Sequence, residues 1–173
     1  MKLRVLLSLV SAFLFAFQSM TAHADKQNYP GSMCKRTNTS QPYAMITSGE
    51  YVNPQHIPSH VDCPIVRTDF NEGSHHAGIE SSWLDAVDDN TQTNVCARLF
   101  KHLKFDRYED LQSTPQNCTK GHGNDGQVIR FGNFFIGSDY YALYFSAFIP
   151  AAEYIAMTGE DLRSSIVAYH VEQ

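Results

Sequence analysis

The segment DYYALYFSAFIP, residues 139–150, constrains the fold most, because no other part combines apolar and aromatic residues so continuously. Side chains alternate along a β-strand, so residues 141, 143, 145, 147 and 149 would share one face, which is apolar throughout. The even-numbered residues 140–148 would form an amphipathic face. The pattern predicts a central strand, packed on one face and mostly covered on the other. Pro150 would end it, because proline has no N–H for a further ladder bond.

The N-terminal residues have the features of a secretory signal peptide. Lys2 and Arg4 precede an uncharged run over residues 5–17, and the segment Ala22-His23-Ala24 supplies the small residues that a signal peptidase needs. The apolar run is shorter than the ~20 residues of a membrane-spanning helix. We therefore predict a signal peptide over residues 1–24, with cleavage after Ala24. The mature chain, residues 25–173, would be one secreted or periplasmic domain, long enough to form a core.

The charge of the mature chain argues against two classes of partner. Without the two cations of the leader it keeps 11 of the 13 Lys and Arg residues, against 18 Asp and Glu, which gives a formal charge of about −7. Phosphates and anionic lipids would be repelled, so we expect no nucleic-acid binding and no docking on a membrane by charge. No second apolar run reaches spanning length, so we expect no membrane span in the mature chain.

All four cysteines, Cys34, Cys63, Cys96 and Cys118, follow the predicted leader. In an oxidising compartment an even number most simply means two disulfides, which can pair in three ways. We favour the pairing of neighbours, Cys34 with Cys63 and Cys96 with Cys118. Each of these bonds would close a loop whose ends could lie on adjacent strands, or on a strand and its following loop. No two cysteines have the C-x2-4-C spacing of a structural zinc site.

Short strands and turn residues account for most of the mature chain. Alternating patterns predict strands near residues 43–53, 61–67, 79–87, 95–100, 127–136 and 165–171. Pro64 would mark an edge or a bulge. We expect one antiparallel pair of 79–87 with 95–100, a hairpin of 127–136 with the central strand, and helical turns within 108–112 and 151–163. About seven to nine strands at this spacing predict an all-β, two-sheet antiparallel sandwich of Greek-key or jelly-roll type.

Five short motifs, taken in order, resemble a group of exported bacterial proteins of uncharacterised function. They are GSMC at 31–34, VDCP at 61–64, Asp88 followed by VCARL at 95–99, the aromatic strand at 140–150, and IVAYHVE at 166–172. The group often has a cysteine near the end of the aromatic strand, where this chain has Ser146. Cys118 would then be the replacement partner of Cys96. The resemblance implies a secreted β-sandwich and no activity.

Candidate metal and catalytic residues have simpler explanations. The candidate metal ligands are His75-His76 with Asp69 or Glu72, His56 with His60, and Asp85, Asp88 and Asp89 with Asn90. Polar loop histidines and an acidic turn account for them better, so we predict no metal and no cofactor. There is no G-x-S-x-G motif and the cysteines are explained as disulfides, so we predict no catalytic residue. Glu80, Asp85 and Asp88 are the carboxylates that a glycoside hydrolase could use.

Aromatic residues are the basis of the binding hypothesis. Trp83, Tyr140 and Tyr144 could present flat rings to a sugar or to a protein, although a large aromatic such as Trp83 more often fills a core. We expect a non-enzymatic binding protein whose partner is a glycan or a cell-envelope protein. The alternatives are a small secreted hydrolase on the same scaffold and a structural subunit that pairs through an edge strand.

Overall fold

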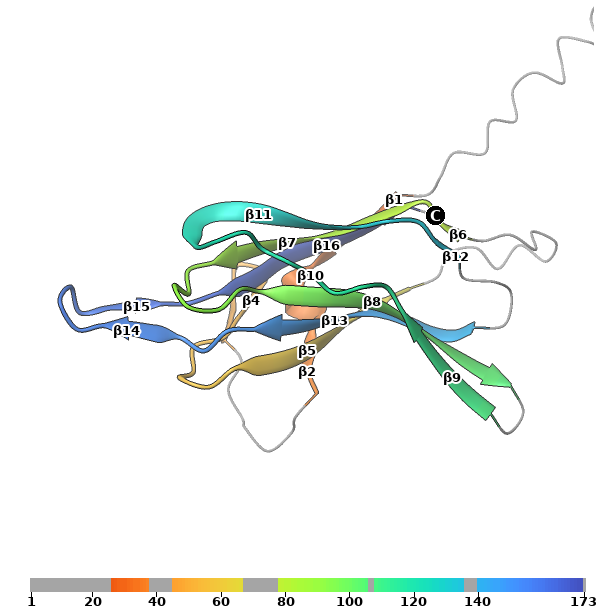
Figure 1. Cartoon of the computed structure of the whole chain (residues 1–173), viewed down its shortest axis with the longest axis horizontal. Coiled ribbons are helices and arrows are strands. Elements are labelled where there is room, and N and C mark those ends of the chain that lie inside the picture. Colours follow the sequence, from red (N-terminus) through yellow and green to blue (C-terminus); the bar gives the residue numbers. More distant parts are fainter. Residues whose placement is uncertain (1–25, 38–44, 67–77, 106–107, 136–139, 173) are drawn as a thin grey trace, which may run out of the picture.

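A computed structural model of the chain describes residues 26–37, 45–66, 78–105, 108–135 and 140–172 (Figure 1). The predicted leader and the His75-His76 pair with Asp69 and Glu72 lie outside the described residues. The described segments are strands and turns, together with one short 3-10 turn. The elements are β1 (Lys26–Pro30), η1 (Gly31–Met33), β2 (Lys35–Arg36), β3 (Met45–Thr47), β4 (Glu50–Val52), β5 (Ser59–Ile65), β6 (Gly78–Ile79), β7 (Ser81–Asp88), β8 (Cys96–Phe105), β9 (Tyr108–Ser113), β10 (Asn117–Cys118), β11 (Gly123–Phe131), β12 (Phe134–Phe135), β13 (Tyr140–Ile149), β14 (Glu153–Ile155), β15 (Glu160–Leu162) and β16 (Ser165–Glu172).

Two antiparallel sheets pack face to face and confirm the predicted sandwich (Figure 1). Sheet A has the order β11-β7-β16-β4-β3, with β1 also paired to β16, and sheet B has the order β10-β8-β13-β5-β2, with β9 also paired to β8. From β4 to β16 the main strands pass back and forth between the sheets, so that β4-β16-β7-β11 lies against β5-β13-β8-β9. This order is that of a jelly roll, one of the two predicted topologies.

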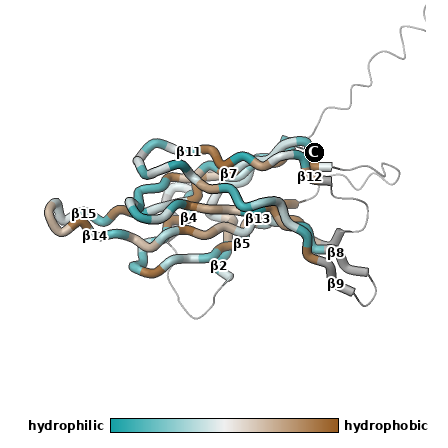
Figure 2. The backbone as a smooth tube through the Cα atoms, in the orientation of Figure 1, coloured by the Kyte–Doolittle hydropathy of each residue, from teal (hydrophilic) through white to brown (hydrophobic). Residues whose placement is uncertain are grey.

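The core lies between the sheets and is built from alternate residues of the long strands. The odd-numbered residues Leu143, Phe145, Ala147 and Ile149 of β13 are buried, as predicted. Figure 2 shows short hydrophobic and hydrophilic stretches alternating along the sandwich strands. The Phe145 ring meets the Tyr169 ring of β16 edge to face, with 5.8 Å between centroids, which joins the two sheets at their centre.

The buried ring of Tyr169 also makes a polar link between the sheets. Its hydroxyl donates a hydrogen bond to the Pro64 carbonyl of β5, at 2.7 Å. Burial, and then the nearby Tyr29, raise the pKa of this hydroxyl above its ordinary value. Pro64 lies in β5 beyond the two residues, Val61 and Asp62, that pair with β2. The proline therefore stands where one side of β5 has no ladder partner among the described residues, which agrees with the expected local edge.

Both predicted disulfides are confirmed. Cys34 follows η1 and bonds to Cys63 of β5, and Cys96 of β8 bonds to Cys118 of β10. In each pair the Cα atoms are 4.0 Å apart. Disulfides persist in oxidising compartments, so the two bonds indicate a place outside the reducing cytosol. Within the described part of the chain, no helix is long and apolar enough to cross a membrane.

The predicted hairpins are wrong, although their strands exist. The strand β7 pairs with β11 and β16 in sheet A, whereas β8 pairs with β13, β9 and β10 in sheet B. The turn after Asp88 therefore carries the chain from one sheet to the other. In the same way β11 pairs with β7, and β13 pairs with β5 and β8. Alternation along a strand identifies its buried face but not its neighbour, so the pattern could not separate the two arrangements.

The predicted helical turns are strands. Residues of β9 pair with β8 from Phe100 to Phe105, and β14 pairs with β15 around a turn that contains Gly159. The β8–β9 hairpin extends from one end of the sandwich, and the β14–β15 hairpin extends from the other end (Figure 1). Ladder hydrogen bonds to a neighbouring strand override the weak local helical pattern of these polar segments.

Gly31 fixes how η1 sits on sheet A. A Cβ atom at this position would lie 1.9 Å from the Ile166 carbonyl oxygen of β16. Only glycine permits this approach, which lets the chain cross the end of β16 and continue to Cys34.

Candidate ligand-binding face

The outer face of sheet B carries a row of polar side chains that crosses four strands. Ser146 of the central strand β13 stands opposite Arg98 of β8 and Asp62 of β5, and Asp62 stands opposite Lys35 of β2. Paired residues on adjacent strands point to the same face of a sheet. Ser146 forms a hydrogen bond with Asp62, and Arg98 donates one to Gln116 Oε1 at 3.2 Å.

Aromatic side chains border this polar row on both sides. Tyr144, two residues before Ser146 in β13, stands opposite Phe100 of β8. Their nearly parallel rings have centroids 5.5 Å apart. Phe148, two residues after Ser146, stands opposite His60 of β5. These two rings meet edge to face, with 5.2 Å between their centroids. We call the set Lys35, Asp62, Ser146, Arg98, Tyr144, Phe100, Phe148 and His60 the polar-aromatic face.

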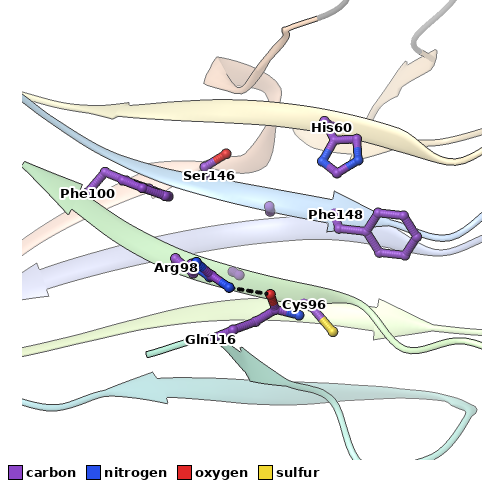
Figure 3. A pocket seen from close by; sticks show the side chains of 9 residues that line it. His60, Cys96, Arg98, Phe100, Gln116, Ser146 and Phe148 are labelled. Carbon is purple, nitrogen blue, oxygen red and sulfur yellow. Dashed lines mark hydrogen bonds between the residues drawn. The ribbon is translucent and has the colours of Figure 1, made fainter. Parts of the chain in front are cut away.

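Two open depressions mark this face. One, of about 190 Å³, lies over β5, β13 and β8 and is lined by His60, Phe148, Ser146, Arg98 and Phe100, among others. Figure 3 shows these side chains on three neighbouring strands, with Ser146 between the rings. The other depression, of about 370 Å³, lies over β2, β5 and β13, next to Lys35, Asp62 and Tyr144.

Partial burial changes the acidity of two groups on the face. Desolvation raises the pKa of the Asp62 carboxyl, while the Ser146 hydrogen bond and nearby His60 act in the opposite direction. Desolvation, and then the charge of Asp62, raise the pKa of the Tyr144 hydroxyl. Tyr144 therefore keeps its proton at neutral pH and can both donate and accept a hydrogen bond.

The three candidate aromatic residues do not form one site. Tyr144 belongs to the polar-aromatic face, whereas Trp83 lies half-buried on the outer face of sheet A, at the opposite side of the sandwich. The expectation that Trp83 fills the core is therefore wrong. The Tyr140 backbone pairs with Leu103 at the start of β13, but its side chain lies outside the described residues.

The outer face of sheet A is occupied by contacts between its own side chains. The Trp83 ring stacks on His170, with centroids 4.8 Å apart, and the Lys26 ammonium lies 4.8 Å from its centre. The His170 ring contacts Asp85 through Nε2 at 2.8 Å and Asn28 through Nδ1. The indole ring of Trp83 is thus in contact with two side chains of its own sheet.

The acidic turn after β7 is a structural network. Asp88 is fully buried and accepts hydrogen bonds from the Val95 amide and from the Thr119 and Ser164 hydroxyls. The Asn90 side-chain oxygen accepts from the backbone amides of residues 92 and 93. These oxygens are already used within the fold. Among the described residues, no group of three or more His, Cys, Asp or Glu could hold a metal ion.

The histidines and carboxylates considered for metal binding or hydrolysis lie apart. His56 bonds to the Ala152 carbonyl, whereas His60 packs on Phe148. Asp85 is on the outer face of sheet A, and Asp88 points into the core. On the polar-aromatic face Asp62 contacts Ser146 directly, whereas in a Ser-His-Asp triad an imidazole lies between the two.

Comparisons with known proteins give distant structural similarity only. No protein-family model matches the chain, and no curated protein matches it. Among solved structures the chain is similar to a family two carbohydrate esterase from Cellvibrio japonicus, with a TM-score of 0.41 and 7% sequence identity. The matched region covers 86% of this chain and 34% of the esterase chain, so this chain spans about a third of that structure. The similarity is too low to inform on function.

Sequence reasoning missed most residues of the polar-aromatic face. Tyr144, Ser146 and Phe148 were recognisable as one amphipathic face of the central strand. Arg98 and Phe100 alternate in the same way with the buried Ala97 and Leu99. The sequence pattern does not show that β13 pairs with both β8 and β5, or in which register.

Proposed function

We propose that the protein is a non-enzymatic carbohydrate-binding protein and that the polar-aromatic face is its binding site. The observation that carries the proposal is the polar row between two aromatic pairs on one side of sheet B. Sugar rings have apolar C–H faces and hydroxyl-lined edges. Aromatic rings match the first, and fixed polar side chains match the second.

The donors and acceptors of the polar row suit a chain of hydroxyl groups. Asp62 accepts hydrogen bonds, Arg98 donates them, and the Ser146 and Tyr144 hydroxyls do both. The row spans three inter-strand intervals, or roughly 14 Å, from Lys35 to Arg98. This length fits an oligosaccharide that lies across the strands better than a single sugar.

A protein partner is less well supported by this face. Large protein interfaces are centred on contiguous apolar anchors. On the described surface the most exposed large hydrophobic residues are Met157 and Tyr154 in the β14–β15 hairpin, Val66 after β5 and Leu111 in β9. None of these four lines either depression of the polar-aromatic face.

The proposal includes the cellular place of the protein. We infer that the chain is exported through cleavage of a leader after Ala24 and belongs to the group of exported bacterial proteins that its motifs resemble. The two disulfides support a place outside the cytosol. A polysaccharide of the envelope or the surroundings would be within reach there.

The test is glycan binding by the purified oxidised protein, measured on a broad glycan array. Tyr144→Ala and Phe148→Ala remove one ring from each aromatic border, and each should weaken binding by about tenfold or more. Trp83→Ala is the matched control, because it removes an aromatic ring from the outer face of the other sheet and should not change binding. Circular dichroism would first establish that all three variants fold.

Two outcomes would reject this proposal. One is the absence of binding to every glycan on the array by a folded, oxidised protein. The other is binding that is lost in folded Trp83→Ala and kept in both sheet B variants, which would place the site on sheet A.

A further inference from the structure

The polar-aromatic face is basic, although the chain as a whole is acidic. The full sequence has a formal net charge of −5. In contrast, the depressions on the outer face of sheet B are lined by the cations Lys35, Arg36 and Arg98 and by one carboxylate, Asp62. This separation of charge concentrates positive potential where the proposed sugar chain would lie.

Among the described residues, the partner of the Arg98 guanidinium is an amide oxygen and not a carboxylate. The guanidinium is exposed, and Nη2 donates a hydrogen bond to Gln116 Oε1 at 3.2 Å. This bond orients the fork of N–H groups and leaves other N–H groups of the guanidinium toward solvent. Two ion pairs among the described residues join Arg163 with Asp161 and His170 with Asp85. Neither pair involves Arg98 or Lys35. The Arg98 fork is therefore available to an anionic group of a ligand, and its geometry matches a carboxylate.

Asp62 makes the polar row asymmetric. It lies two strands from Arg98, a separation of roughly 10 Å, with Ser146 between them. A ligand anion would be repelled near Asp62 and attracted near Arg98. A sugar hydroxyl, in contrast, could donate to Asp62. The row thus favours an acidic sugar near Arg98 and a neutral sugar near Asp62.

We propose that the ligand is an oligosaccharide with carboxylate groups, a uronic-acid-containing glycan, and that Arg98 binds one of these carboxylates. This inference rests on the proposed function, because it names the class of glycan that the same face recognises. Lys35, at the other end of the row, contributes to the attraction as a more distant charge. Neutral glycans would lack the charged contact with Arg98 and bind more weakly.

The experiment compares acidic glycans with their uncharged counterparts. Oligosaccharides of polygalacturonate, alginate and hyaluronan are presented as free acids and as methyl esters, next to sulfated and unmodified dextran and neutral cello- and xylo-oligosaccharides. At least one free acid should bind about tenfold more tightly than its ester, because a hydrogen bond to a charged group is lost on esterification. Added salt should weaken binding of the acid and leave that of the ester unchanged.

Arg98→Gln is the decisive variant. It should weaken binding of the acid by about tenfold and leave binding of the methyl ester unchanged, so that the preference for the acid disappears. Arg130→Gln is the matched control. Arg130 is an exposed arginine of β11 in sheet A, and its replacement removes the same charge from the opposite side of the sandwich. It should keep the preference.

The outcomes separate the two proposals. Equal binding of acids and esters, with loss in Tyr144→Ala and Phe148→Ala, would reject the acidic ligand and keep the carbohydrate site. A preference for the acid that survives in folded Arg98→Gln would reject the role of Arg98. Binding of sulfated dextran in place of every carboxylated glycan would reject the choice of carboxylate. Absence of binding to all glycans would reject both proposals.

Discussion

The imidazole Nε2 of His170 lies 2.8 Å from Asp85 Oδ2, on the outer face of sheet A. Its ring also stacks on Trp83. The two outer faces of the sandwich thus differ in kind. On sheet A the side chains contact one another and tie β1, β7 and β16 together, whereas on sheet B two depressions remain open between polar and aromatic side chains.

Trp83→Ala should therefore lower stability without affecting a ligand on sheet B. The variant loses the stack on His170 and the contact with the Lys26 ammonium, which together should cost about 1–2 kcal/mol of unfolding free energy. Urea denaturation of the wild type and the variant would measure the difference. A variant as stable as the wild type would show that these contacts contribute nothing to the fold.

Asp62→Asn should change the pH dependence of stability. Burial raises the Asp62 pKa in the folded protein above the ordinary value of 3.8, so the folded state binds this proton more tightly than the unfolded state. The stabilisation from Asp62 is then fully present below pH 3.8 and is lost as the pH rises through the raised value. Asparagine carries no charge at any pH.

The unfolding free energy of Asp62→Asn, relative to that of the wild type, should therefore increase from acidic to neutral pH. Denaturation curves at a series of pH values would test this. Asp125→Asn, at an exposed position of β11, is the control for a general effect of charge. A relative stability that falls over the same range would contradict the raised pKa of Asp62.

Asp88→Ala should be among the most damaging substitutions outside the apolar core. It would leave the Val95 amide and the Thr119 and Ser164 hydroxyls without their shared acceptor in a site where Asp88 is 0% exposed. We expect a loss of about 3 kcal/mol or more. Chemical denaturation measures it, with Asp125→Ala as the exposed control, and a loss as small as that of the control would refute the structural role.

Removal of the Cys34–Cys63 bond by a double change to alanine should cost about 3 kcal/mol. The bond closes a loop with a sequence separation of 29 residues and anchors η1 to β5. Reducing agent should destabilise the wild type further than this variant, because the wild type has both bonds to lose. Equal urea midpoints for the oxidised wild type and the oxidised variant would show that the bond adds no stability.

Strand existence and burial could be predicted from the sequence, but strand neighbours could not. The alternation in β13 correctly separated Phe145 from Tyr144, and the spacing of Cys96 and Cys118 favoured their bond. These are local properties. Pairing of β7 with β16 instead of β8 depends on contacts between distant segments, and a turn such as the one after Asp88 serves a hairpin or a passage between sheets equally well.

The same limit explains the partial prediction of the candidate site. Trp83 and Tyr144 are both partly exposed aromatic residues, and no local pattern tells which sheet each belongs to. Arg98 and Asp62 become neighbours of Ser146 only through the register of three strands. The composition indicated that aromatic residues could contact a sugar. Only the fold shows which of them lie on the polar-aromatic face.

The pairing of β1 with β16 affects the order in which the molecule can assemble. Asn28 and His170 contact each other although they are 142 residues apart. The strand β1 therefore has no ladder partner until β16 has been synthesised. Sheet A cannot be completed before that point. Such long-range closure is slow compared with local folding. Completion of sheet A should therefore be a late step in the folding of this chain.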